Sequence, residues 1–539
     1  MADPTTLRPP RRAAGVTVPL FSLRTERSWG VGEITDLPEF GLWARSAGLS
    51  LVQLLPLGEL GAGETSPYGA LSAFGIDPIY IGWGEVEDLP ESVLPFALGD
   101  DASQSLAGVR RSERVDYARV RAVKSRALTA AWRSFRAQHL DRGTERAARY
   151  RRFCRDHAEW LAPYVLFRAL RDLFDGQPWW HWPAPFRDRA ARALEHAWAA
   201  HGDAVQRYQY AQWVAHEQWA DARQRLRASG VEVMGDLPFM VGRDSADLWS
   251  RRGEFKADAS VGAPPDQFND EGQEWGLPPY DWAAMRRDGF RWLRRRARYA
   301  GWMYDRFRID HLVGFYRTYQ RPASRLRGPD GRLAPGEFDP PTPEAQLAHG
   351  EEVVAAMRDA ARDHGADLVA EDLGDIPDYV RPSLARLDVP GYKVLIWERD
   401  GEVFRDPDDY PVRSVACFGT HDTDPVSAWW RSRERWEREA VCALPAMRAR
   451  GGIEALGERF TPEVHSALTA LLMGARSELT LLLMQDILGV DDRVNVPATV
   501  GAQNWTWRLP ATVRELSRDA SVQSRAAMVK AAAQESGRR

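Results

Sequence analysis

Short apolar runs separated by amphipathic helical patterns recur along the chain. Eight runs can be distinguished: Val16–Leu23, Leu51–Leu57, Val231–Phe239, Arg306–Leu312, Asp367–Leu373, Lys393–Glu398, Ser414–Asp422 and Val494–Val500. The patterns between them include Gly350–His364, which ends just before Gly365, a residue suited to the position after a helix C-terminus. Eight alternating units predict an α/β fold, a closed parallel (β/α)₈ barrel of the TIM type.

Two stretches are too long for ordinary connections between a strand and a helix. Residues 58–230, between the second and third runs, carry long helical patterns and predict an inserted, mainly helical lobe. Residues 240–282, after the third run, are rich in Pro, Gly and aromatic residues and predict a long active-site loop. We therefore expect barrel segments at 1–57 and 231–510 and a C-terminal tail at 511–539. Within that tail, Ser517–Arg539 is rich in Ala, Ser, Arg and Gln and is expected to be a frayed helix or disordered.

The fourth apolar run carries charges on one face. Side chains alternate along a strand, so Arg308 and Asp310 share one face while Phe307 and Ile309 share the other. Apolar residues outside and charges inside suit a barrel strand whose carboxyl end opens into an active site. The neighbouring Arg308 favours an ionised Asp310, as a nucleophile requires. Taken alone, the motif is better explained as a structural ion pair.

Two further acidic positions follow similar runs. Glu371 ends the fifth run, and the pair His421–Asp422 ends the seventh. A barrel enzyme assembles one site from several strand ends, so the three carboxylates are expected to meet. Glycoside chemistry requires a nucleophile, a general acid/base with a raised pKa, and polar groups that hold the sugar in the transition state. Asp310, Glu371 and Asp422 fit those roles in that order. Each alone is also typical of a helix N-cap or a loop carboxylate. Asp372 and Asp375 are suited to cap the following helix, and we leave both out of the site.

Around these carboxylates, the motifs R-I-D-H, A-E-D-L-G and G-T-H-D resemble those of the amylomaltases, also called disproportionating enzymes or 4-α-glucanotransferases. More specific is the stretch Gly262–Phe268 with Gly272–Tyr280, which looks like the active-site loop of that family. Further matching motifs are Gly235–Pro238, Asp244–Trp249, Ser66–Tyr68, Asn495–Pro497 and Asn504–Arg508. Gly69, Val313 and Ala498 depart from the residues usual in the family, and they bear on fine substrate preference.

The resemblance implies retaining transfer of α-1,4-glucan segments between maltooligosaccharides, or to glucose, through a covalent glucosyl-enzyme. Starch or glycogen-derived glucans would be the source of substrate. Asp310 would attack, Glu371 would act as acid and then base, and Asp422 would hold sugar hydroxyls. The expected substrate-binding residues are Tyr68, Asp236, Asp266, Trp275, Arg308, His311, His421 and Asn495. This chemistry requires neither a metal nor another cofactor, and the sequence has no clustered Cys/His ligand set.

Two other functions have to be weighed. A hydrolase of α-1,4-glucans shares the first half of the reaction, so residue types alone do not separate it from a transferase. The aromatic residues Phe268, Trp275 and Tyr280 of the loop favour a sugar acceptor, because they offer a partly closed apolar surface. A non-catalytic glucan-binding protein on the same fold would be expected to have lost a catalytic carboxylate, and all three are present.

Composition narrows the partners and the compartment. The 539 residues include 72 basic and 76 acidic ones, a net charge of −4 that gives no overall field for nucleic acid or an anionic membrane. Three cysteines without a C-x-x-C motif, and an N-terminus without a secretory signal, predict free thiols and a cytoplasmic enzyme. The longest helical apolar stretch, Leu479–Met484, is too short to span a membrane. Nothing in the sequence indicates an oligomeric state.

Overall fold

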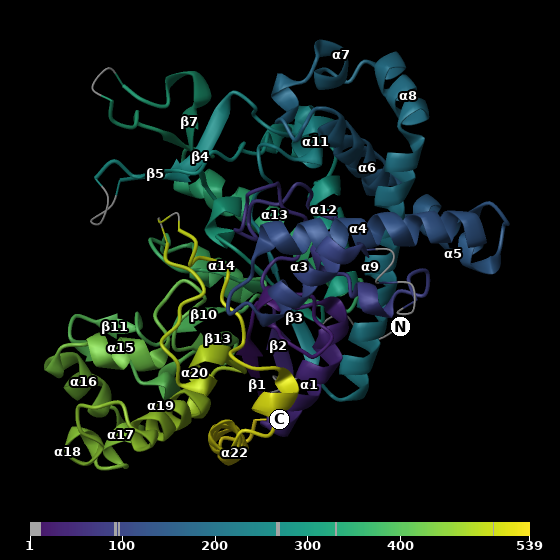
Figure 1. Cartoon of the computed structure of the whole chain (residues 1–539). Coiled ribbons are helices and arrows are strands. Elements are labelled where there is room, and N and C mark those ends of the chain that lie inside the picture. Colours follow the sequence, from purple (N-terminus) through teal and green to yellow (C-terminus); the bar gives the residue numbers. More distant parts are fainter. Residues whose placement is uncertain are drawn as a thin grey trace, which may run out of the picture.

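The structure is a computed structural model that describes residues 12–90, 94, 98–265, 270–328, 331–497, 499 and 501–538. Within these ranges, eight strands form one parallel sheet rolled into a barrel (Figure 1). The barrel strands are β1 (Ala13–Thr17), β2 (Leu51–Gln53), β3 (Glu232–Leu237), β6 (Arg306–Ile309), β9 (Asp367–Ala370), β10 (Gly391–Val394), β13 (Ser414–Cys417) and β14 (Leu479–Leu483). They follow one another around the barrel in chain order, and β14 pairs with β1. The predicted barrel is confirmed.

Seven predicted runs contain or overlap a barrel strand, but the eighth prediction was wrong. The described residues of Val494–Val500 form no strand, and the last barrel strand is β14. All five residues of β14 are buried, so the strand shows no alternation of polar and apolar positions. A continuous apolar run of this kind is not distinguished from a buried helix by its periodicity. For this reason the sequence pattern of 479–484 was interpreted as helical.

The barrel interior is apolar at its centre, and its closure between β9 and β10 is thin. Ten side chains fill the interior: Ala13, Leu51, Met234, Val369, Tyr392, Val394, Val415, Cys417, Leu479 and Leu481.

Between β9 and β10, the Ala370 amide donates to the Pro390 carbonyl at 2.8 Å. The Tyr392 amide donates to a carboxylate oxygen of Asp372 at 2.7 Å, and Asp372 also pairs with Arg381. Asp372, expected as a helix cap, therefore joins two strands.

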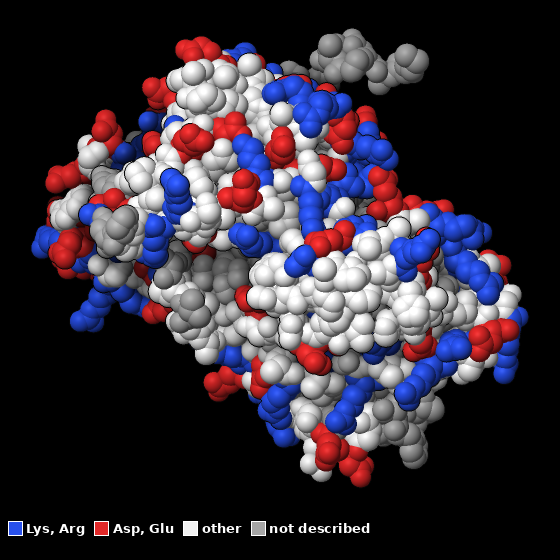
Figure 2. All heavy atoms as spheres, turned by 90° about the horizontal axis from the view of Figure 1, so that it is seen from above, with Lys and Arg blue, Asp and Glu red and all other residues white. Residues whose placement is uncertain are grey.

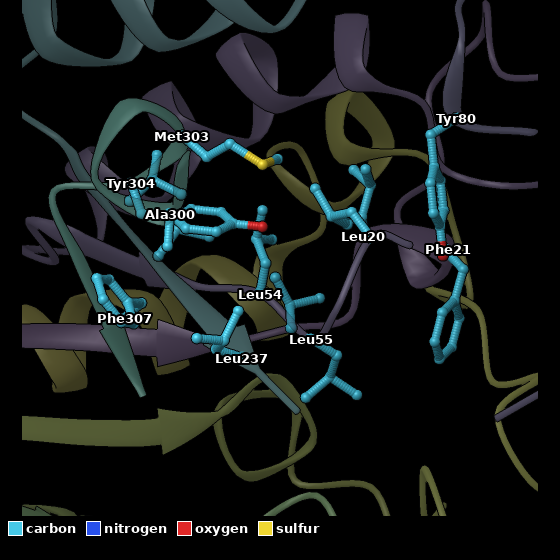
Figure 3. Close-up of a cluster of buried hydrophobic side chains, with 14 of the residues drawn as sticks. Leu20, Phe21, Leu54, Leu55, Tyr80, Leu237, Ala300, Met303, Tyr304 and Phe307 are labelled. Carbon is cyan, nitrogen blue, oxygen red and sulfur yellow. The ribbon is translucent and has the colours of Figure 1, made fainter. Parts of the chain in front are cut away.

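Helices cover the outside of the barrel. They include α1 (Leu37–Ser46), α12 (Arg291–Met303), α13 (Pro343–Arg362), α14 (Val380–Arg386) and α20 (Met484–Leu488). Figure 3 shows how this outer core is built: Leu237 of β3 and Phe307 of β6 lie near Ala300 and Met303 of α12 and near Tyr304, which follows it. Phe307 thus points outward while its neighbour Arg308 points into the barrel, as the alternation predicts.

The segment between β2 and β3 is mainly helical and lies beside the barrel. Its helices are α3 (Asp100–Arg111), α4 (Tyr117–Phe135), α5 (Glu145–Asp156), α6 (Ala158–Leu173), α7 (Ala184–Arg187), α8 (Ala191–Ala200) and α9 (Gly202–Ala228). Lys124 of α4 forms a buried ion pair with Glu33 at 2.6 Å and donates to two backbone carbonyls. Because a buried charge is costly without partners, this pair fixes the position of α4 against the barrel.

A small antiparallel sheet in the order β5-β4-β7-β8 lies above the barrel mouth (Figure 1). Its strands β4 (Ala259–Ala263) and β5 (Gln273–Glu274) belong to the predicted loop after β3. The other two, β7 (Thr318–Pro322) and β8 (Glu337–Asp339), come from the connection after β6. The short helices α10 (Ala246–Ser250) and α11 (Trp282–Arg287) flank β4 and β5 in the sequence. The predicted loop is thus built together with a second excursion that the sequence did not reveal.

A second group of helices lies between β13 and β14, and the chain ends in two more. The group is α15 (Val426–Ser432), α16 (Arg435–Cys442), α17 (Pro445–Arg448), α18 (Gly452–Leu456) and α19 (Pro462–Gly474), and the last two are α21 (Val513–Leu516) and α22 (Ala520–Glu535). The end of the chain differs from the expected frayed or disordered tail. Helix α22 contributes Val529 to the core, and the buried Arg538 donates to the carbonyls of Met473 and Ala13.

The chain has nearly equal numbers of basic and acidic residues, and both kinds are found on its surface. Figure 2 shows basic and acidic side chains interspersed over the face that it presents. No helix in the described part of the chain is long and apolar enough to cross a membrane. The described residues contain no group of three or more His, Cys, Asp and Glu side chains placed to hold a metal ion.

Candidate active site

The carboxyl ends of the barrel strands open into a cleft of about 970 Å³. Its wall is formed by Tyr68, Pro238, Phe239, Met240, Trp275, Leu277, Arg308, Asp310, His311, Glu371, Leu373, Gly374, Asp375, Arg381, Val394, Trp397, Glu398, Thr420 and Asp422. Aromatic and apolar side chains thus surround a few carboxylates, which is the usual make-up of a small-molecule site. The three predicted catalytic carboxylates all line this one cleft.

Arg308 is shared between two carboxylates at the base of the cleft. Its guanidinium lies 2.7 Å from Asp310, which directly follows the same strand, and 2.7 Å from Asp236 on β3. The Asp236 side chain is fully enclosed, whereas 33% of the Asp310 side chain is exposed to the cleft. Asp310 is therefore the one of these two carboxylates that can reach a substrate, and it does so with the guanidinium of Arg308 beside it.

Glu371 follows β9 and faces the same cleft. The backbone N–H of His311 donates to its carboxylate at 2.6 Å, and His311 has a left-handed backbone with φ of +44°. Burial raises the pKa of Glu371 to about 8; the positive charge of Arg308 opposes this shift, and the negative charge of Asp310 adds to it. At neutral pH the Glu371 carboxyl is therefore protonated while Arg308 supports the charge of Asp310.

Asp422 is held by side chains from the loop after β14. Asn495 donates from its amide nitrogen to Asp422 at 2.6 Å. Arg493 donates to the Asp422 carbonyl and pairs with Asp424 at 3.1 Å. The Asp422 side chain lines the cleft and keeps 38% of its surface exposed. His421, which is buried, lies 3.4 Å from that carboxylate.

Tyr68 lines the cleft from the lobe side. Its hydroxyl donates to Asp236 at 2.8 Å and lies 3.1 Å from a ring nitrogen of His421. Its ring stacks on His421 with 5.7 Å between centroids and lies 5.9 Å from Trp505. The hydroxyl is engaged with protein groups, which leaves the ring as the part of Tyr68 that is available to a ligand.

Trp275 and His311 meet edge to face above the cleft. Their ring centroids are 4.9 Å apart, and the Trp275 indole N–H donates to Gln273 at 3.0 Å. Burial lowers the pKa of His311 to about 4, so its imidazole is neutral at neutral pH. The strand β5 ends directly before Trp275, so the small sheet determines where this indole lies.

The structure divides the predicted site residues into two groups. Seven line the cleft: Tyr68, Trp275, Arg308, Asp310, His311, Glu371 and Asp422. Asp236, His421 and Asn495 lie behind that wall and contact its residues. Asp266 lies outside the described residues.

Several lining residues were not predicted. Trp397 and Glu398 follow β10, and Phe239 and Met240 follow β3. Trp397 and Glu398 close the sixth apolar run, so their place after a barrel strand was a usable signal. Asp375, which we assigned to a helix cap, also lines the cleft and is exposed.

Comparisons with known proteins agree with one another. The model of one family, described as 4-alpha-glucanotransferase, matches residues 18–513. The 4-alpha-glucanotransferase of Thermus thermophilus is 32% identical over 494 residues, which cover 89% of this chain and 92% of the relative. That of Chlamydia muridarum is 28% identical over 532 residues, covering 95% and 93%. The amylomaltase from Streptococcus agalactiae, solved in complex with acarbose, has a TM-score of 0.81 at 24% identity and covers 98% of this chain and 100% of its own.

Proposed function

The chain belongs to the 4-alpha-glucanotransferase family, and from this premise we propose that Asp310, Glu371 and Asp422 carry out its reaction by double displacement. The activity itself, a 4-α-glucanotransferase of the amylomaltase type acting on α-glucans, follows from the family and its relatives. The main observation behind this assignment of residues is that two carboxyl groups in different environments, Asp310 and Glu371, line one cleft. Asp310 is ion-paired with Arg308, while burial keeps Glu371 protonated at neutral pH.

The first half of the reaction cleaves an α-1,4 bond. A carboxylate oxygen of Asp310 attacks the anomeric carbon, and Glu371 gives its proton to the oxygen of the departing glucan. The products are a free glucan with a new 4-hydroxyl and a glucosyl ester on Asp310. The negative charge of Asp310 is lost in this ester and gained by Glu371, so the charge beside Arg308 is conserved within the site.

The second half transfers the glucosyl group. The carboxylate of Glu371 takes a proton from the 4-hydroxyl of an incoming sugar, and the sugar oxygen attacks the anomeric carbon of the ester. Asp310 leaves as a carboxylate, and Glu371 is protonated again. The neutral His311 above Glu371 offers a hydrogen-bond partner for sugar hydroxyls without adding a charge.

Asp422 binds the sugar at the site of cleavage, and its neighbours hold it in place. Asn495 donates to one carboxylate oxygen, and His421 lies 3.4 Å from the other. The exposed part of the side chain faces the cleft, where it can accept from sugar hydroxyls. Asp236, His421 and Asn495 act by positioning Arg308, Tyr68 and Asp422, because their side chains are buried behind the cleft. Tyr68 presents its ring to the donor sugar.

The acceptor is a sugar rather than water. Trp275 directly follows β5, meets His311 edge to face and lines the same cleft as Glu371, so its indole covers an incoming glucose or maltooligosaccharide. Maltooligosaccharides, and glucans derived from starch or glycogen, are the donors. The protein acts in the cytoplasm, a reducing compartment that suits the free thiols of Cys154, Cys417 and Cys442.

Trapping the covalent intermediate tests the assignment. Asp310→Asn and Glu371→Gln should each abolish transfer from maltotriose, because each removes a chemical function with little change in volume. Glu371→Ala should still be loaded by a maltosyl fluoride, since fluoride leaves without a proton from the enzyme. Mass spectrometry of peptides should then find the sugar on Asp310. An adduct on another residue, or a Glu371→Gln variant with normal activity, contradicts the proposal.

Product analysis separates transfer from hydrolysis. A transferase converts maltotriose into glucose together with maltopentaose and longer chains. A hydrolase gives glucose and maltose without longer products, and a protein that only binds glucan returns maltotriose unchanged.

A further inference from the structure

Large apolar side chains are exposed in one region next to the cleft. Trp397, Val403 and Trp436 have 52%, 71% and 41% of their surface exposed. Trp397 follows β10, and Val403 belongs to the β11–β12 hairpin (Arg399–Asp400 and Val403–Phe404) that comes next. Trp436 lies on helix α16, which follows β13. A concentration of exposed aromatic residues on a soluble protein indicates a binding surface.

This region is continuous with the catalytic cleft. Trp397 lines the cleft together with Asp310 and Glu371. Two residues further on, Arg399 places its guanidinium 6.0 Å from the ring centroid of Trp436 and 6.0 Å from that of Phe404. Arg399 is in turn paired with Glu437 of α16 at 3.3 Å. The hairpin thus connects an indole inside the cleft to an indole outside it.

The chemistry of the surface suits a glucan chain. An exposed indole stacks against the apolar face of a sugar ring, and the guanidinium and carboxylate groups beside it bind hydroxyls at the ring edge. The contacts of Arg399 with Trp436 and Glu437 hold the indole in place before a ligand arrives, which lowers the entropy lost on binding.

We propose that Trp436, Arg399 and Val403 form an outer platform for glucose units that extend from the cleft past Trp397. The platform rests on the proposed function, because its ligand is the part of a long α-glucan that the cleft does not enclose. A short substrate such as maltotriose is held by the cleft alone. The platform therefore makes the enzyme favour long glucans over short ones.

The test compares long and short substrates in two matched variants. Trp436→Ala should lower the ratio of kcat/KM for amylose to kcat/KM for maltotriose by about 5-fold, the loss expected for one stacking contact. Trp198→Ala on α8 is the control, because Trp198 has a similar exposure of 37% and lies in the helical lobe. Electrophoresis in gels that contain amylose gives an independent measure of binding: Trp436→Ala should be retarded less than the wild type and Trp198→Ala equally.

The outcomes separate this proposal from the proposed function. If the wild type makes no longer products from maltotriose, the proposed function fails. If it does so and both variants keep the wild-type ratio, the platform is refuted while the function stands. A change of molecular mass by size-exclusion chromatography in Trp436→Ala, with an unchanged ratio, also refutes it and marks the surface as an interface between two copies of the chain.

Discussion

Arg308 pairs with two aspartates that differ in their exposure to the cleft. It pairs with both Asp236 and Asp310, but only Asp310 is open to the cleft. The enclosed Asp236 fixes the guanidinium, and the guanidinium stabilises the charge of Asp310 near Glu371. Since two carboxylates that share a site resist ionising together, the protonated Glu371 is a consequence of this arrangement as well as of its burial.

The pH dependence of the reaction should report Glu371. Its carboxyl must be protonated to release a sugar, so kcat/KM for maltotriose should fall above about pH 8, roughly tenfold for each further pH unit. The matched control is a maltosyl fluoride with glucose as acceptor. The departure of fluoride needs no enzyme proton, so kcat/KM for the fluoride should not fall over the same range. If kcat/KM fell above about pH 8 for both substrates, the pKa that governs this fall would belong to a group other than Glu371.

Trp275 should control whether the covalent intermediate reacts with a sugar or with water. Trp275→Ala removes a stacking surface worth about 1 kcal/mol and opens the acceptor side to water. We expect more glucose released by hydrolysis relative to the longer maltooligosaccharides formed, measured by chromatography of the products over time. Thermal unfolding is the control. A loss of about 3–5 kcal/mol in stability with an unchanged product ratio would show a core residue instead.

At the residue scale, the alternation of side chains along a strand was enough to predict which face of the strand each residue lies on. The alternation of strand side chains placed Arg308 and Asp310 inside the barrel, and both lie there. The contacts behind Asp422 were beyond such reasoning, because Asn495 reaches it from the loop after β14. Nothing in the local sequence of either segment encodes the distance between them. The enclosure of Asp236 was unpredictable for the same reason: it depends on Tyr68, which comes from the lobe.

At the scale of elements, the sequence predicted the approximate positions of seven barrel strands, but it did not predict the eighth or the pairing of the segments inserted between strands. The strand β4 bonds to β7, although β6 and helices α11 and α12 lie between them in the chain. Both strands are short, with Gly and Pro within or beside them, so neither gives a strong strand signal. The sheet that carries Trp275 therefore appears only in three dimensions.

The contact between β3 and the end of α12 allows a test of packing. A Cβ added at Gly235 would overlap the ring of Tyr304, which is buried against β3. Gly235→Ala should lower the free energy of unfolding by about 1–3 kcal/mol, because the core leaves no room for the extra group. Urea denaturation followed by tryptophan fluorescence measures it.

Gly253→Ala is the matched control for Gly235→Ala, since nothing lies near the Cβ position of Gly253 and its backbone is not left-handed. Its urea midpoint should stay within error of the wild type. A Gly235→Ala midpoint that also stays there would show that Tyr304 moves aside without cost.

At the scale of the whole molecule, the end of the chain supports the base of the barrel. Arg538 is buried and donates to the carbonyls of Ala13, Met473, Ala475 and Glu478, which lie next to β1 and β14. Arg538→Ala leaves buried carbonyls without donors and should lower the free energy of unfolding by about 1–3 kcal/mol, measured in urea. kcat/KM for maltotriose should not change, because the cleft opens at the other end of the strands.

The control for Arg538→Ala is Arg514→Ala. Arg514 is 54% exposed and lies 3.4 Å from Glu26, a surface pair that contributes less than about 1 kcal/mol. Equal effects of the two substitutions would mean that the buried carbonyls are satisfied by water after the arginine is removed.

The thin closure between β9 and β10 makes one side of the barrel more compliant than the rest. Every other neighbouring pair of barrel strands is joined by a backbone ladder, which resists widening of the cylinder. Between β9 and β10 the strands are joined by a single backbone hydrogen bond and by the hydrogen bond to the Asp372 side chain. Glu371 stands directly before Asp372, at the mouth of this seam. Glu371, the proposed general acid, therefore lies on the wall that we expect to widen most easily when a bulky chain enters. Asp310, the proposed nucleophile, follows a strand that is bonded on both sides.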